Sequence, residues 1–118
     1  MKKLLISSIL LLFTFSIYAQ NNEPVIEWDK TFGGKNNDEA SSIIQTTDGG
    51  FVLAGNTGSK GKGYSDFWVI KFDKNGNKIW DKTFGGKNMD IANSIIQTTN
   101  GEFVVAGYTD SKGTGGYD

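Results

Sequence analysis

Short apolar runs of β-branched and aromatic residues alternate along the chain with turns rich in Gly, Asn and Asp. Such runs are typical of β-strands, and no stretch beyond residue 20 has the 3.6-residue period of an amphipathic helix. Consecutive apolar positions at 51–54 and 67–70 predict a sheet that is covered on both faces. The predicted strands of one complete set are residues 42–47, 51–57, 66–73 and 78–84.

The same pattern returns with an offset of 52 residues. Residues 28–66 align without gaps on residues 80–118, and 28 of the 39 aligned positions are identical. Self-similarity at this period is typical of propellers, solenoids and other repeat arrays. Four strands per repeat, joined by tight turns, predict an all-β fold made of four-stranded antiparallel blades of a β-propeller, with about 52 residues per repeat.

The phase of the repeat divides residues 20–118 into an outer strand at 25–32, a full blade at 38–84 and a partial blade at 90–118. A closed propeller usually has four to eight blades, so the propeller is predicted to be incomplete in this chain. The expected partners are therefore the remaining blades of the same protein or further copies of the chain. Within the full blade, Asn75-Gly76 predicts a hairpin with a type I′ turn.

Residues 1–19 have the layout of a secretory signal peptide. Lys2 and Lys3 precede a mostly apolar run at 4–17, and Ala19 ends the segment. A membrane-spanning helix needs about 20 apolar residues, and this run has 14. The segment predicts an exported protein without a membrane span after cleavage, located in the periplasm, at the cell surface or outside the cell.

The amino-acid composition excludes several kinds of catalytic and binding site. The chain contains no His, Cys or Arg, which excludes triads with a His base, zinc sites of the His/Cys kind and bidentate Arg clamps on phosphate. Residues 20–118 contain 10 Lys and 13 Asp and Glu, which gives a net charge near −3. This charge argues against a nucleic-acid partner. We predict no catalytic, cofactor-binding or metal site.

Five residues are candidate ligand contacts in loops. Asp38 and Asp90 occupy the same place after Gly-Gly-Lys-Asn in the two copies. They either contact a ligand or fix their loops by accepting backbone N–H groups. Tyr64, Tyr108 and Tyr117 lie in or beside loops and are candidates for exposed stacking against a ligand.

A further set of positions forms a recognisable repeat pattern: Trp28, Gly33, Gly34, Asp38, Ala40, Ile43, Thr46, Gly49, Phe51, Val52, Ala54, Gly55, Thr57, residues 66–73, Gly76 and Trp80. This pattern resembles the SBBP-type β-propeller repeat. It is also similar to repeats of large exported bacterial proteins that end in a type IX secretion sorting domain. The resemblance covers nearly all of residues 20–118 and implies a propeller fold, and some proteins with such repeats carry glycanase-like names.

Two functions fit these features, and a third, a propeller dehydrogenase with a quinone cofactor, fits the broad architecture only. The first is a non-enzymatic exported repeat segment, a scaffold or a module that binds a carbohydrate or protein ligand, because similar loops repeated in space suit multivalent binding. The alternative is a glycan-active, endoglucanase-like enzyme or its accessory propeller domain. An enzyme is expected to break the repeat symmetry with acidic residues in one copy. The substitutions Asn37/Met89, Glu39/Ile91, Asn56/Tyr108 and Gly50/Glu102 create no obvious acid pair.

Overall fold

The computed structural model of the chain describes residues 23–113. The segment predicted to be a signal peptide and Tyr117 lie outside the described residues. The part of the chain from 23 to 113 contains six strands and no helix, which confirms the all-β prediction. The strands are β1 (Asp38–Gln45), β2 (Phe51–Thr57), β3 (Asp66–Phe72), β4 (Lys78–Phe84), β5 (Asp90–Gln97) and β6 (Phe103–Thr109).

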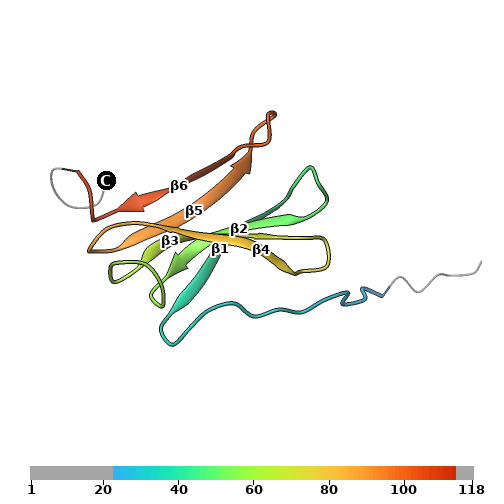
Figure 1. Cartoon of the computed structure of the whole chain (residues 1–118), viewed down its shortest axis with the longest axis horizontal. Helices are drawn as coiled ribbons and strands as arrows, with labels where there is room; N and C mark the ends of the chain where they lie inside the picture. The colour runs from blue at the N-terminus through green and yellow to red at the C-terminus, as the bar shows by residue number, and fades with distance from the viewer. Residues whose placement is uncertain (1–22, 114–118) are drawn as a thin grey trace, which may run out of the picture.

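The strands form two antiparallel sheets. One has four strands in the order β1-β2-β3-β4, and the other has the pair β5-β6 (Figure 1). The predicted four-stranded meander is therefore confirmed, and neither sheet closes on itself within the described residues. β1 begins at Asp38 rather than at the predicted residue 42, because a bulge between Ala40 and Ser42 interrupts the apolar alternation while pairing with β2 continues.

The sequence repeat is also a repeat in space. The pairing of β5 with β6 has the same register as that of β1 with β2, and its bulge lies between Ala92 and Ser94, 52 residues after the first bulge. Gly55 and Gly107 lie opposite these bulges, at the closest approach of the two backbones. A Cβ on Gly55 would lie 1.9 Å from the carbonyl oxygen of Glu39. Both bulges therefore require glycine on the neighbouring strand.

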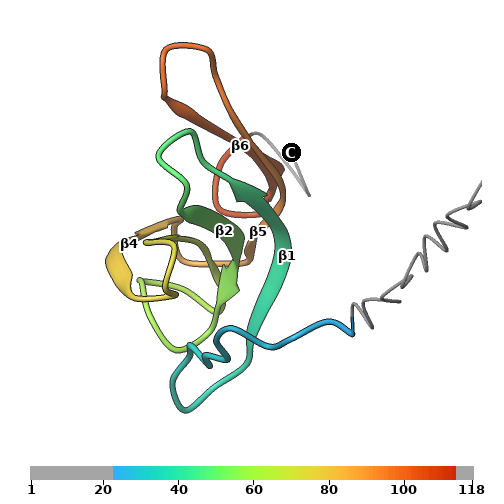
Figure 2. The same ribbon diagram turned by 90° about the vertical axis from the view of Figure 1, so that its right-hand side faces the viewer.

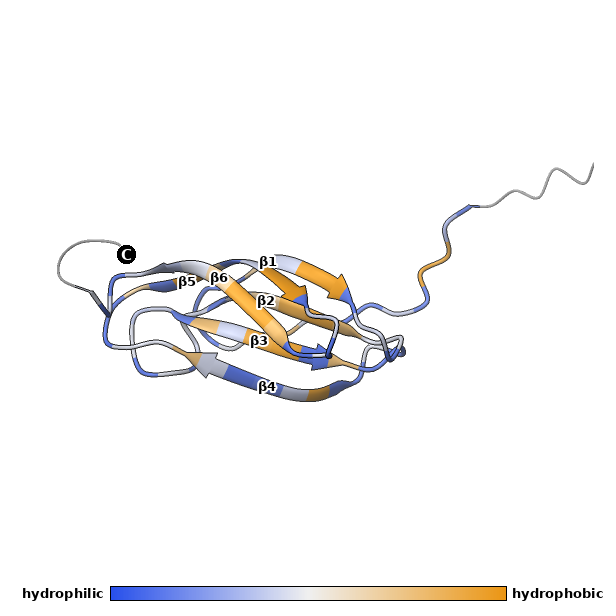
Figure 3. Cartoon of the chain, turned by 90° about the horizontal axis from the view of Figure 1, so that it is seen from above, coloured by the Kyte–Doolittle hydropathy of each residue, from blue (hydrophilic) through white to orange (hydrophobic). Residues whose placement is uncertain are grey.

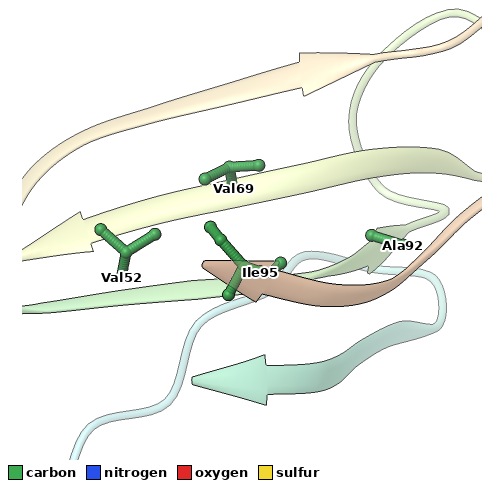
Figure 4. Close-up of a cluster of buried hydrophobic side chains, with 5 residues drawn as sticks. Val52, Val69, Ala92 and Ile95 are labelled. Carbon is green, nitrogen blue, oxygen red and sulfur yellow. The ribbon is translucent and has the colours of Figure 1, made fainter. Parts of the chain in front are cut away.

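The two sheets stack face to face, with β5 against β1, β2 and β3. We call the side of the four-stranded sheet that β5 and β6 cover its front face, and the opposite side its back face. The core between the sheets joins the front face of the first repeat to the back face of the second (Figure 4). The buried members of this core are Val52, Ala54, Val69, Ala92 and Ile95. Hydrophobic residues occur along β2, β3 and β6 and at the end of β1, whereas the edge strand β4 is largely hydrophilic (Figure 3).

The segment before β1 lies on the back face, on the opposite side of the four-stranded sheet from β6 (Figures 1 and 2). Phe32 packs on Phe72 with ring centroids 4.7 Å apart, and Trp28 meets Phe51 edge-on at 5.9 Å. Residues 25–32, predicted to be an outer strand, form no strand in the structure. Residues 25–32 correspond in the repeat to β4, which pairs with β3. Among the described residues no equivalent of β3 has an edge left unpaired, so residues 25–32 have no strand to join.

The hairpin between β3 and β4 is not a type I′ turn, so that prediction is wrong. Between residues 23 and 113 no non-glycine residue has a positive φ, and in this hairpin only Gly76 does, at 76°. The N–H of Gly76 donates to the carbonyl of Asp73 at 3.1 Å, and the N–H of Asp73 donates to the carbonyl of Asn77 at 2.9 Å. This is a type I turn followed by a glycine bulge. The Asp73 carboxylate accepts the N–H groups of Asn75 and Asn77, which stabilises this alternative.

The buried side chain of Lys71 holds the turn between β1 and β2 through its hydrogen bonds to Thr46 and Asp48. The effect of this contact on the pKa of Asp48 can be measured. Asp48 accepts hydrogen bonds from the Thr46 hydroxyl, the N–H of Gly50 and the Lys71 ammonium, which together lower its pKa to about 2. Replacing Lys71 by Met should raise the pKa of Asp48 toward its ordinary value, because one donor and a positive charge are lost. Thr46→Val should raise the pKa of Asp48 by more than Lys71→Met does, because the Thr46 hydroxyl has the largest effect on that pKa. NMR titration of the carboxyl carbon measures both changes, and an unchanged pKa in the Lys71→Met variant would contradict this assignment.

Candidate functional site

A network of hydrogen bonds ties the loop before β1 to the loop after β2, with Asp38 at its centre. The Asp38 carboxylate accepts the N–H of Gly34 and the hydroxyl of Ser59, each at 2.8 Å, and also the hydroxyl of Thr57. The N–H of Asn36 donates to the Ser59 hydroxyl at 2.9 Å. The glycine pair allows this closeness, because a Cβ on Gly34 would lie 2.6 Å from that of Ser59.

The second repeat contains the same network around Asp90. Its carboxylate accepts the N–H of Gly86 at 2.8 Å, the hydroxyl of Ser111 at 2.7 Å and the hydroxyl of Thr109. The N–H of Asn88 donates to Ser111 at 3.0 Å. We call each of these networks an aspartate clamp. Both candidate aspartates are thus engaged within their own loops, in the loop-fixing arrangement that was one of their two interpretations.

The clamps stabilise the ionised form of their aspartates. Burial alone would raise the pKa of Asp38 and of Asp90. Hydrogen bonds from the threonine, the serine and the glycine N–H outweigh this effect, so the pKa of each carboxyl group lies below its ordinary value. Each clamp therefore stabilises the fold above the pKa of an unfolded aspartate, near 3.9, and loses this contribution as the pH falls through the folded pKa.

A second buried carboxylate lies beside the clamp of the second repeat. Asp66 is almost fully buried, and its Oδ2 accepts the N–H of Lys62 at 2.5 Å. No donor in the described part of the chain reaches its Oδ1. A Cβ on Gly85 would lie 2.2 Å from Asp66 Oδ1 and 2.6 Å from Asp90 Oδ2. Two buried carboxylates therefore meet against one glycine at the boundary between the repeats, and any side chain at this position would collide with both.

A groove of about 710 Å³ opens at this boundary, at the end of the sheet where β1, β3 and β5 begin and β2 ends. It is bounded by both repeats, which are joined here by a parallel bridge between Ser65 and Met89 and by a 2.7 Å hydrogen bond from the N–H of Asp90 to the carbonyl of Ser65. The groove is lined by Lys35, Asn36, Asn37, Glu39, Asn56, Gly58, Gly63, Tyr64, Ser65, Met89 and Ile91.

The groove combines amide groups with one exposed aromatic ring. Tyr64 is 82% exposed, although it lies between two ordered elements of the first repeat. Asn56 is buried in the wall, where its Nδ2 donates to the Ser65 hydroxyl at 3.3 Å while its Oδ1 has no donor among the described residues. Glu39 supplies the one carboxylate among the lining residues. The groove therefore offers hydrogen-bonding amides, an aromatic face and a single negative charge.

Differences between the two repeats concentrate at this groove. The 11 lining residues represent nine positions of the repeat, because Asn37 is equivalent to Met89 and Glu39 to Ile91. Six of these nine positions differ between the copies, compared with 11 of 39 over the whole alignment. The clamps, the bulges and the core are almost unchanged. The repeat therefore keeps its scaffold and varies the walls of the groove.

The structure separates the five sequence candidates. Tyr64 lies in the groove, whereas Asp38 and Asp90 are each engaged in a clamp. Tyr108 is half-buried on β6, outside the groove, and Tyr117 lies outside the described residues. Sequence reasoning missed Asn56 and Glu39 as groove residues. The signal that identifies them is their substitution in the second copy, by Tyr108 and Ile91.

Comparison with known protein families, with curated proteins and with solved structures found no match to this chain. Between residues 23 and 113, no three His, Cys, Asp or Glu side chains gather closely enough to hold a metal ion. Over the same residues, no helix has the length and apolar character needed to cross a membrane.

Proposed function

We propose that the chain is an exported β-propeller repeat segment that acts as a scaffold and binds a carbohydrate in the groove between its repeats. The observation that carries the proposal is the concentration of inter-repeat differences at the groove walls. Exposed loop positions also vary where nothing binds, but Asn56 and Ser65 are buried groove residues and they too differ between the copies. Repeats that share a scaffold and differ at one groove are well suited to presenting related but distinct binding surfaces.

The chemistry of the groove favours a carbohydrate. The Asn37 amide can donate to and accept from hydroxyl groups, and the ring of Tyr64 offers a face for the apolar side of a sugar ring. The Asn36 amide already donates to the carbonyl of Gly58 at 2.8 Å, which leaves its oxygen to accept from a ligand. The groove is open and polar, which suits a ligand that keeps many of its hydroxyl groups hydrated. Export, which residues 1–19 predict, would bring the protein into contact with polysaccharides outside the cytoplasm.

The alternative is a glycan-active enzyme that uses the same groove. Glycosidases of the common kind use two carboxyl groups about 5–9.5 Å apart across the scissile bond. Glu39 is the one carboxylate lining the groove, because the Asp38 side chain is held in its clamp. This arrangement supports binding ahead of hydrolysis as the proposed role.

The proposal predicts that Tyr64→Ala weakens carbohydrate binding. An array of plant, fungal and bacterial oligosaccharides would identify a ligand, and calorimetry would measure its dissociation constant. Loss of the exposed ring should raise that constant about fivefold, because an aromatic contact contributes on the order of 1 kcal/mol. The substitution should leave the melting temperature unchanged, since Tyr64 is 82% exposed.

Phe84→Ala is the matched control, because Phe84 is also an exposed aromatic residue but does not line the groove. Equal losses in the two variants, or no binding to any oligosaccharide at millimolar concentration, would contradict the proposed groove. Release of reducing sugar that disappears in a Glu39→Gln variant would instead establish the enzymatic alternative.

A further inference from the structure

We propose that the front face of the second repeat binds the back face of the first repeat of a second copy of this chain. The contact would repeat, between molecules, the stacking seen between the two repeats inside one molecule. This inference deepens the proposed scaffold role. It does not depend on any ligand of the groove, so the two proposals can fail separately.

Equivalent residues in the two repeats differ in burial according to whether a neighbouring repeat covers them. Val52, on the covered front face of the first repeat, is fully buried, whereas its equivalent Val104 is 50% exposed. On the back faces, Ile95 is covered by the first repeat and is 2% exposed, whereas its equivalent Ile43 is 55% exposed. The exposed surfaces around Val104 and Ile43 thus correspond to the part of the internal contact that β1, β2 and their equivalents make. The part made by Val69 and Trp80 has no equivalent in the second repeat between residues 23 and 113.

The composition of these surfaces supports the same contact. On the front face, Ile44, Val52 and Ala54 correspond to Ile96, Val104 and Ala106, and each pair is identical. On the back face, Ile43, Phe51 and Leu53 correspond to Ile95, Phe103 and Val105, and the one difference is a single methylene group. A second copy therefore presents nearly the same side chains to Val104 that the second repeat presents to Val52.

Two further contacts of the internal stacking have matching partners at the uncovered surfaces. The N–H of Thr47 donates to Oε1 of Gln97 at 3.0 Å across the internal boundary. Thr99 and Gln45 are the equivalent residues at the uncovered surfaces, and they have the same side chains. Trp80 packs against Phe103 across the internal boundary at 6.2 Å, and Trp28 already makes the equivalent contact with Phe51 at 5.9 Å. Trp28 therefore takes, on the back face, the place that Trp80 of β4 has at the internal boundary, and it leaves the area around Ile43 uncovered.

The contact uses two different surfaces, so it is heterologous. However many copies bind in a row, the copy at one end keeps an uncovered front face and the copy at the other end keeps an uncovered back face. Heterologous contacts form rings when the rotation between copies closes and open chains when it does not. Either outcome gives a mass that rises with protein concentration above that of the monomer.

Sedimentation velocity of the purified exported chain over a range of concentrations tests the proposal. We expect species larger than the monomer, and we expect Val104→Lys to weaken the association at least tenfold because it would bury a charge in an apolar contact. Ile79→Lys is the control, because Ile79 is 57% exposed and belongs to neither set of facing residues. A wild-type chain that remains monomeric at every concentration would overturn the proposal.

Engineered cysteines test the orientation independently of any folding defect in the Val104 variant. The chain has no cysteine, so new disulfides are easily assigned. A Gln45→Cys chain and a Thr99→Cys chain should form a disulfide-linked dimer when they are mixed and oxidised, and each should remain uncrosslinked alone. Crosslinking of either variant with itself would show a symmetric contact, and no crosslinking in the mixture would also reject the proposed geometry.

Discussion

Replacing Gly55 by Ala should destabilise the protein by about 3 kcal/mol, at the upper end of the range for overpacked interiors. A Cβ at this position would lie 1.9 Å from the carbonyl oxygen of Glu39 and 2.9 Å from Cα of Ala40. Both atoms belong to the backbone of β1 and cannot rotate away as a side chain can. The bulge would have to open, and the hydrogen bonds between β1 and β2 around it would weaken.

A loss of this size is a large part of the ~5–15 kcal/mol that stabilises a typical domain. In a chain of this length it should lower the melting temperature by on the order of 15 °C, which thermal and urea unfolding would both detect. Gly49→Ala is the control. Gly49 has a φ of 82°, and a Cβ added there would have no other atom within 4 Å, so only the conformational penalty of about 1 kcal/mol applies. Equal losses at the two glycines would show that the close approach at Gly55 is readily relieved.

The strand pattern was readable from the sequence because its signals are local. The bounds predicted for β2 and β4 are the observed ones, residues 51–57 and 78–84. Apolar and β-branched residues mark each strand, and turn residues mark its ends. The type I′ prediction is wrong because the Asp73 carboxylate accepts the backbone N–H groups of Asn75 and Asn77 and so stabilises a different turn. Residues 25–32 resemble β4 in sequence but form no strand, because a strand also needs a partner and the sequence pattern does not indicate whether one is present.

The groove was harder to predict than the strands. Its walls come from positions as far apart as Glu39, Tyr64 and Met89, which are brought together by strand pairing and by the bridge at Ser65. The spacing of these residues along the chain does not indicate that they lie together. The substitutions between the repeats were visible, but their common location became apparent only once the repeats were stacked. Sequence identity between repeats thus predicts the scaffold, and their differences mark the groove.

Replacing Asp90 by Ala should remove about 3 kcal/mol of stability. The side chain is buried and accepts three hydrogen bonds, and Ala would leave the N–H of Gly86 and the hydroxyl of Thr109 without their acceptor. Each hydrogen bond to a charged group contributes on the order of 1.5–3 kcal/mol. The expected value lies well below the sum of three bonds, because measured contributions of neighbouring hydrogen bonds are not additive.

The equivalent substitution Asp38→Ala provides the control, because the same three donors surround Asp38 in a more exposed clamp. We expect a loss of about 1–2 kcal/mol there. Urea unfolding at pH 7 and at pH 3 separates the role of charge from that of packing. The unfolded state binds protons at a higher pH than either clamp, so wild-type stability should fall below pH ~4. Both alanine variants should show a shallower decline, because the substitution removes one of the groups responsible. An Asp90→Ala protein that declines as steeply as the wild type would show that the clamp stabilises the loop without its charge.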